Sequence, residues 1–172
     1  KKKYFFSKNN KKILFIGNLK YLPNILAVKH FVNNILPKLE KKIPDIRFEI
    51  IGEIGGIDKF LFSMNKKVKC LGPQKNLDKF MKGTFCALAN IEVATGIQTK
   101  VLTYMSYGLP IICSSVIASN FKKSVLIYKS DKDLIEKIYN LKNNRNLSNK
   151  ISKKSLNFIK KHYWKKVDKE YL

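Results

Sequence analysis

Short runs of apolar residues, several of which end at glycine, alternate along the chain with segments whose apolar residues recur at helical spacing. Continuous apolar runs are typical of strands covered on both faces, whereas apolar positions three and four residues apart predict amphipathic helices. The runs that predict buried strands cover residues 11–18, 46–52, 67–73, 85–89, 110–113 and 125–128.

Helices are predicted between and after these runs. The expected segments are residues 23–37, 77–81, 97–107, 132–141 and a final amphipathic stretch over 147–167. Pro37 predicts a kink or break in the first helix, because proline lacks the amide that an interior helical position donates. Asp131 is expected to be the N-cap of the fourth helix, and Gly55-Gly56 predicts a loop. Asn143-Asn144 separates the last two helices.

This order of elements predicts an α/β fold. Strands that alternate with helices form parallel sheets with right-handed crossovers, so we expect one domain with a doubly wound, Rossmann-like, parallel six-stranded sheet. Ligands bind such sheets outside the carboxyl ends of the strands. The functional site is therefore expected in the loops that follow Ile16, Ile51, Leu71 and Ala89.

The charge of the chain is strongly positive, because 35 Lys and Arg oppose 12 Asp and Glu, which gives +23 over 172 residues. Apolar residues make up 45%, which supplies a core and excludes a disordered polyelectrolyte. Only Arg47 and Arg145 are arginines, whereas nucleic-acid recognition favours the planar guanidinium. We expect no specific nucleic-acid partner and an accessory contact with an anionic membrane, for which the C-terminal lysines are candidates. A basic polyanion-binding module stays open as an alternative function.

The cysteines and histidines do not form a metal-binding pattern. Cys70, Cys86 and Cys113 lie far apart in apolar surroundings, which favours buried thiols in a reducing compartment. His30 and His162 are isolated and are expected at the surface. We expect no metal and no cofactor, and a cytoplasmic location that includes a peripheral position at the inner face of the membrane. The chain begins with Lys1 rather than Met, which indicates a trimmed or internal fragment.

The segment from Thr95 to Ile112 carries the most informative chemistry. Gly96 follows a buried strand and opens a predicted helix, whose first amides carry about half a positive charge and suit a phosphate. Lys100 adds a full charge in the first turn. A P-loop requires Gly where Thr99 stands, and no Gly-x-Gly-x-x-Gly follows the first strand. Two interpretations remain open on this evidence, a phosphate cradle and a plain turn beside an exposed lysine.

Several motifs occur in an order that resembles a known family. They are Phe15-Ile16-Gly17-Asn18, Pro23-Asn24, Ile35-Leu36-Pro37, Ile50-Ile51-Gly52, Leu71-Gly72-Pro73, residues 96–102, Tyr104-Met105 and residues 108–112. Together they resemble the C-terminal, donor-binding domain of GT-B glycosyltransferases of the family-4, or group 1, type. This resemblance covers nearly the whole chain and implies one half of a GT-B fold.

The resemblance implies a nucleotide-diphosphate-sugar donor and a retaining, hexosyltransferase-like transfer to a glycan or lipid-linked acceptor in polysaccharide biosynthesis. Lys100 would be catalytic, because it would offset the charge that develops on the leaving diphosphate. The residues implied in donor binding are Gly17, Asn18, Lys20, Gly52, Gly72, Gly96, Ile97, Gln98, Thr99 and Thr103. No metal is implied.

The resemblance also implies a division of the chain and a missing partner domain. Residues 1–10 would be an N-terminal extension, 11–143 the nucleotide-sugar-binding domain, and 144–172 a helix packing back on this domain or on an absent N-terminal half. The fragment alone would be inactive. Thr95 stands where the family has an acidic residue, and Thr103 stands where it has the Glu that holds the ribose. Asn18 stands where many members have Arg. These departures leave open a non-catalytic descendant of the family.

Overall fold

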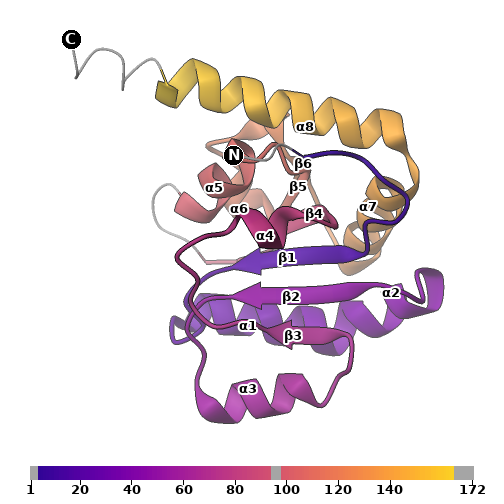
Figure 1. The fold of residues 1–172 in the computed structure, drawn as a ribbon, viewed down its shortest axis with the longest axis vertical. Coiled ribbons are helices and arrows are strands. Elements are labelled where there is room, and N and C mark those ends of the chain that lie inside the picture. The colour runs from indigo at the N-terminus through magenta and orange to yellow at the C-terminus, as the bar shows by residue number, and fades with distance from the viewer. Residues whose placement is uncertain (1–3, 94–97, 165–172) are drawn as a thin grey trace.

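The fold is known from a computed structural model, which describes residues 4–93 and 98–164 (Figure 1). Its strands form one parallel sheet in the order β3-β2-β1-β4-β5-β6. They are β1 (Lys12–Ile16), β2 (Arg47–Ile51), β3 (Val68–Cys70), β4 (Thr84–Ala89), β5 (Ile111–Cys113) and β6 (Leu126–Ile127). The predicted doubly wound, Rossmann-like sheet is confirmed, and its strand order reverses between β1 and β4. This reversal creates the crevice in which such sheets bind ligands.

Helices cover both faces of the sheet and bury two apolar clusters. The cluster on one face includes residues of α1 (Leu22–His30), the π-helical turn Phe31–Ile35, α2 (Leu36–Lys42), α3 (Gly56–Ser63) and α7 (Asp131–Asn143). The cluster on the other face includes residues of α4 (Asp78–Met81), α5 (Thr99–Ser106), α6 (Ser115–Ala118) and α8 (Arg145–Ile159). Shorter turns occupy Lys122–Ser124 and Lys160–Trp164. Every residue of β4 is buried, which explains its continuous apolar run.

Three local expectations need correction. The first helix continues through Pro37 to Lys42, and its irregularity is the π-helical turn just before the proline, where the amide of Leu36 donates to the carbonyl of Phe31. The N-cap of α7 is Ser130, whose hydroxyl accepts from the amide of Asp133, so the choice of Asp131 was wrong. Helix α3 starts at Gly56, within the glycine pair taken only as a loop.

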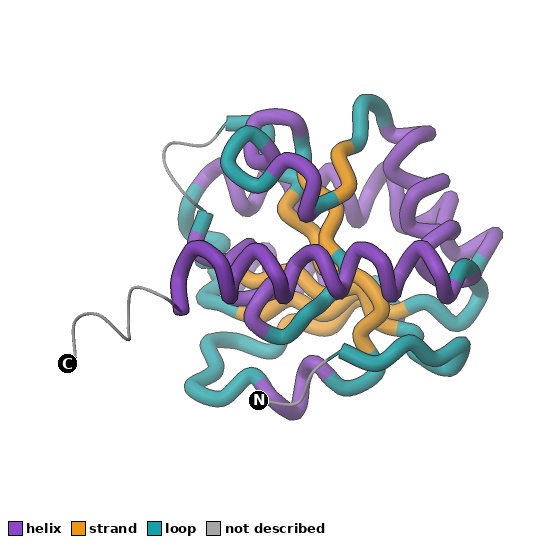
Figure 2. The backbone as a smooth tube through the Cα atoms, turned by 90° about the horizontal axis from the view of Figure 1, so that it is seen from above, coloured by secondary structure: helices purple, strands orange, loops and turns teal. Residues whose placement is uncertain are grey.

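The long helix α8 lies across the face that carries α5 (Figure 2). The turn between α5 and β5 contains Gly108 at a φ of +70°, and a Cβ there would lie 3.0 Å from the side chain of Leu156. Glycine therefore permits both the turn and the close approach of α8. The amide of Tyr4 donates to the carbonyl of Tyr107, so the N-terminal segment lies beside the same turn. Within residues 4–93 and 98–164, every helix is too short or too polar to span a lipid bilayer.

Candidate functional site

Three glycines follow the first three strands at the carboxyl edge of the sheet. The amide of Gly17 donates to the carbonyl of Ile51 at 2.9 Å, and the amide of Gly52 donates to that of Gly72 at 3.0 Å. Gly52 has a φ of +142°, and a Cβ on it would lie 2.0 Å from the carbonyl oxygen of Gly17. Only glycine allows this approach of two backbones. Gly17, Gly52 and Gly72 thus form a ledge of bare backbone, which we call the glycine ledge.

The side chain of Lys100 reaches the glycine ledge from the first turn of α5. Its ammonium donates to Oδ1 of Asn24 at 2.6 Å and lies 4.4 Å from the ring centroid of Phe15. A Cβ on Gly17 would lie 3.0 Å from the same nitrogen. Lys100 is only 8% exposed, so it is not the exposed lysine of the alternative interpretation.

The charge of Lys100 has no carboxylate to balance it among the ion pairs of the described residues. Burial lowers the pKa of Lys100 to about 7, because an ammonium loses its hydration there, and the Cys113 thiol opposes this shift only in part. The partner amide of Asn24 is neutral. An anion that came within reach of Lys100 would therefore stabilise the charged form, and the site suits a phosphate.

Two buried side chains, which the sequence analysis names only as members of motifs and without a role, hold this arrangement. Asn24 accepts from Lys100 through Oδ1 and donates through Nδ2 to the carbonyl of Asn18 at 2.8 Å. The hydroxyl of Tyr104 accepts from the amide of Ile16 at 2.6 Å and donates to the carbonyl of Leu88 at 3.2 Å. Asn24 therefore joins α5 to the loop after β1, and Tyr104 joins α5 to the ends of both strands at the reversal point.

A signal for these two residues was present in the sequence. Asn24 is a polar residue in the first turn of a helix, next to Ile25 on its buried side. Tyr104 lies inside the family motif, but the motif alone gives it no role. Their partners are 76 and 88 residues away in the chain, so only the fold brings the groups together.

Some predicted donor-binding residues are engaged with their own neighbours. Lys20 is exposed and pairs with Glu53 at 3.0 Å, while the side-chain oxygen of Asn18 accepts from the amide of Lys20 at 2.8 Å. The hydroxyl of Thr103 donates to the carbonyl of Thr99 one turn earlier, at 3.1 Å. These side chains stabilise the loop after β1 and the first turn of α5.

The remaining predicted residues lie at the start of α5 or before it. Gln98 is the N-cap residue by position, although its side chain makes no capping hydrogen bond, and Thr99 is the first helical residue. The amide of Val101 donates to the carbonyl of Gln98 at 3.0 Å, so the first turn of α5 closes on its N-cap residue. Gly96 and Ile97 lie outside the described residues.

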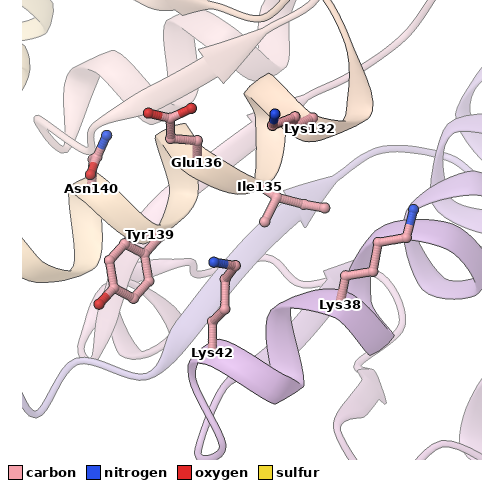
Figure 3. Close-up of a pocket in the computed structure, with 7 residues that line it drawn as sticks. All are labelled: Lys38, Lys42, Lys132, Ile135, Glu136, Tyr139 and Asn140. Carbon is pink, nitrogen blue, oxygen red and sulfur yellow. The ribbon is translucent and has the colours of Figure 1, made fainter.

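Two cavities in the described part of the molecule lie at different places relative to the site. A cavity of about 430 Å³ lies between α1 and the segment after β4, and Leu22, Leu26 and Val93 line it. A larger one of about 610 Å³ lies between α2 and α7, where Lys38 and Lys42 face residues of α7 (Figure 3). Lys100 lines neither, and the second has no contact with the glycine ledge. The described residues hold no group of three or more His, Cys, Asp or Glu that could bind a metal ion.

The chain is similar in fold to solved GT-B glycosyltransferases. A structure of TarM from S. aureus in complex with UDP, fondaparinux and a GlcNAc-glycerol superposes with a TM-score of 0.74 at 17% identity, covering 95% of this chain and 34% of TarM. Anabaena HepE with UDP-glucose gives 0.71 at 12% identity, covering 90% and 45%. The pneumococcal O-GlcNAc transferase GtfA with UDP and GlcNAc gives 0.58 at 19%, covering 94% and 36%.

These likenesses define one Rossmann-like half of a GT-B fold, and the chain spans less than half the length of each of these proteins. Residues 10–144 match the family model described as glycosyl transferases group 1. The chain belongs to this family. No protein with a curated description matches the sequence.

Proposed function

We propose that the chain is the donor-binding domain of a glycosyltransferase and that it holds a nucleoside-diphosphate sugar at the glycine ledge. The observation that carries this proposal is the buried ammonium of Lys100, which lies next to the bare backbone of Gly17 and has no carboxylate partner among the described residues. UDP is the first ligand to test, because the structures of TarM and GtfA contain UDP and that of HepE contains UDP-glucose.

In the proposed reaction an acceptor hydroxyl of a glycan or lipid-linked sugar attacks the anomeric carbon. The bond from that carbon to the β-phosphate oxygen breaks with its electron pair, and this oxygen receives the acceptor proton. Transfer on the face that the diphosphate leaves gives retention. Lys100 would lower the barrier by stabilising the negative charge on the departing diphosphate. A glycan or lipid-linked acceptor would give the protein a role in polysaccharide biosynthesis.

The proposal divides the chain as the sequence predicts. Residues 11–143 would form the donor-binding domain, with 1–10 as an extension and 144–172 as a helical segment that packs back. In the described part of that segment, α8 contacts α5 of the same domain. The acceptor would be held by a second GT-B domain, so the 172 residues alone are expected to bind nucleotide but to transfer no sugar.

Isothermal titration calorimetry with UDP tests the proposal. Lys100→Met should abolish saturable binding to the chain. Lys142→Met is the matched control, because Lys142 is also 8% exposed but donates to the carbonyls of Lys8 and Asn10, away from the glycine ledge. Circular dichroism checks that both variants fold. If neither UDP nor any other nucleoside diphosphate binds, even to the chain joined to a second GT-B domain, the proposal is wrong.

A non-catalytic descendant of the family is the second candidate. The observation that favours it is the hydroxyl of Thr103, which is uncharged and donates within α5, where the family resemblance implies a glutamate for the ribose. The variant Thr103→Glu distinguishes a donor-binding domain from a non-catalytic descendant of the family. A donor domain with a weakened ribose contact should gain about tenfold in UDP affinity from a charge-assisted hydrogen bond. A descendant that has lost nucleotide binding should gain none.

A further inference from the structure

The hydrogen-bond ladder between β1 and β4 stops before either strand ends. Its last pair is Leu14 with Ala87. Beyond this pair each strand continues to pair on its other side, β1 with β2 as far as Ile16 and β4 with β5 as far as Ala89. The gap is therefore local, and it lies at the point where the strand order reverses.

The hydroxyl of Tyr104 fills this gap. If the ladder continued in register, the amide of Ile16 would donate directly to the carbonyl of Leu88, because the next amide, that of Gly17, already faces β2. Instead, the hydroxyl accepts from the amide of Ile16 at 2.6 Å and donates to the carbonyl of Leu88 at 3.2 Å. One oxygen atom is thus inserted between two backbone groups that would otherwise bond to each other. We call this hydroxyl the Tyr104 spacer.

The Tyr104 spacer is buried and keeps its proton. The side chain is fully buried, and this burial raises the pKa of Tyr104 well above its ordinary value, although the hydrogen bond from Ile16 opposes the rise. A protonated hydroxyl accepts and donates at once, so it satisfies both backbone groups. The strand ends are therefore held apart by a side chain without leaving a buried backbone group unpaired.

The Tyr104 spacer acts beside Lys100. The two residues are one turn apart in α5 and lie on one face of the helix. Tyr104 contacts the amide of Ile16, and the ammonium of Lys100 lies beside Gly17, the next residue of the chain. One face of α5 therefore meets two consecutive residues at the end of β1. The contact made by Tyr104 fixes where the ammonium lies relative to Gly17.

We infer that Tyr104 is a positioning residue for the proposed donor site. Its hydroxyl keeps the reversal point open and thereby holds Gly17 and the ammonium of Lys100 in the geometry that a diphosphate would meet. Without the hydroxyl, Ile16 and Leu88 would either bond directly and close the gap or stay unpaired, and both alternatives displace the end of β1. The effect on nucleotide affinity rests on the proposed function, whereas the effect on Lys100 does not.

The variant Tyr104→Phe removes only the hydroxyl. It should weaken UDP binding about tenfold in titration calorimetry, because the cation and the bare backbone no longer match the diphosphate. The matched control is Tyr107→Phe, at the end of the same helix, which keeps a buried ring and loses the hydrogen bond to Asp78 at 2.7 Å. This control should bind UDP within about twofold of the unchanged chain. Thermal unfolding of both variants separates a loss of stability from a loss of affinity.

The pKa of Lys100 gives a readout that needs no nucleotide. Nuclear magnetic resonance of the lysine side chains follows the titration of Lys100, and the spectrum of Lys100→Met identifies its signal. In the unchanged chain burial lowers the pKa of Lys100 to about 7. In Tyr104→Phe this pKa should rise towards the ordinary value of 10.5, because an ammonium displaced from Gly17 regains water. Tyr107→Phe should leave the pKa unchanged.

The outcomes separate the inference from the proposed function. If the pKa of Lys100 stays the same in Tyr104→Phe, or moves equally in Tyr107→Phe, the inference is wrong. If the pKa rises but Tyr104→Phe binds UDP as tightly as the unchanged chain, Tyr104 does not position the donor site. If no nucleoside diphosphate binds any of these proteins, the proposed function fails, and the pKa alone decides whether Tyr104 positions Lys100.

A second variant serves if Tyr104→Phe does not fold. A fluorotyrosine placed at position 104 alone keeps the ring and the hydroxyl but makes the hydroxyl oxygen a weaker acceptor. The amide resonance of Ile16 and the titration of Lys100 should then shift together. A titration of Lys100 that the fluorine leaves unaffected would overturn the inference.

Discussion

The ammonium of Lys100 and the side-chain oxygen of Asn24 lie 2.6 Å apart and join the start of α5 to the start of α1. Both residues are buried, and the amide group of Asn24 also donates to the carbonyl of Asn18. The loop after β1 and the cation that would face a phosphate are therefore fixed by one side chain. A substitution at Asn24 should therefore change the affinity of the proposed donor site for a nucleotide.

Asn24→Asp should weaken UDP binding about tenfold or more, because a carboxylate beside Lys100 would satisfy its charge and repel a diphosphate. Asn24→Ala is the uncharged companion variant and should weaken binding less. Calorimetry gives both affinities. Equal affinities for Asn24→Asp and the unchanged chain would show that Lys100 does not meet the nucleotide.

The burial of Lys100 predicts a dependence of stability on pH. Its pKa is lowered to about 7 in the folded state from 10.5, so between these pH values the unfolded chain binds a proton that the folded chain does not. Stability therefore rises as the pH increases from 7 to 10, by roughly 2–4 kcal/mol from this group. Lys100→Met should lose this rise. Urea unfolding at pH 6, 8 and 10 gives the free energy of unfolding of the unchanged chain and of Lys100→Met. If this free energy changes with pH equally in the two proteins, the pKa of Lys100 is not lowered.

Nucleotide binding should return the proton to Lys100. At pH 8 the amine is mostly neutral in the free protein, and a diphosphate nearby favours the ammonium. We expect uptake of nearly one proton for each UDP bound at pH 8, and much less at pH 6. Calorimetry in buffers of different ionisation enthalpy measures it. The control variant Lys142→Met should take up a proton on UDP binding as the unchanged chain does. If the unchanged chain binds UDP at pH 8 without taking up a proton, the proposed role of Lys100 is wrong.

Three glycines give a graded test of the glycine ledge. Gly52→Ala should cost more than about 3 kcal/mol of stability, since the methyl group would collide with the backbone of Gly17 at a φ of +142°. Gly17→Ala meets the side-chain nitrogens of Asn24 and Lys100 at 3.0 Å and the ring of Phe15 at 3.1 Å, but no backbone atom. It should therefore displace the ammonium and lower UDP affinity at a smaller stability cost of about 1 kcal/mol. Gly56→Ala, with nothing within 4 Å, should be neutral or stabilising. Thermal unfolding ranks the variants, and equal losses at Gly17 and Gly56 would contradict the contact with Lys100.

The sequence predicts the sheet well because its signals are local. Each strand is a short apolar run, and Gly17, Gly52 and Gly72 mark where the first three end. It predicts helix details less well where neighbouring residues compete. Ser130 and Asp131 are both good N-caps, and the choice depends on which one leaves the helical conformation. The spacing of Ile57, Phe60 and Leu61 is helical, but the glycine pair before them was the stronger signal for a loop.

The candidate site was predictable only in part, because its key contacts join distant segments. Lys100 and Gly17 could be chosen from their motifs. The burial of Lys100 and its link to Asn24 could not, since they depend on how α5 packs over the reversal point of the sheet. The pairing of Lys20 with Glu53 likewise depends on the loops after β1 and β2 lying side by side.

A ledge made of main chain cannot distinguish one base or sugar from another, because every nucleoside diphosphate offers it the same two phosphates. If the donor sits there, the choice of donor must be made by side chains elsewhere around the crevice. Such side chains can change without disturbing Gly17, Gly52 or Gly72. The domain would then be well suited to acquire new donor preferences, in evolution or by engineering, while its grip on the diphosphate stays constant.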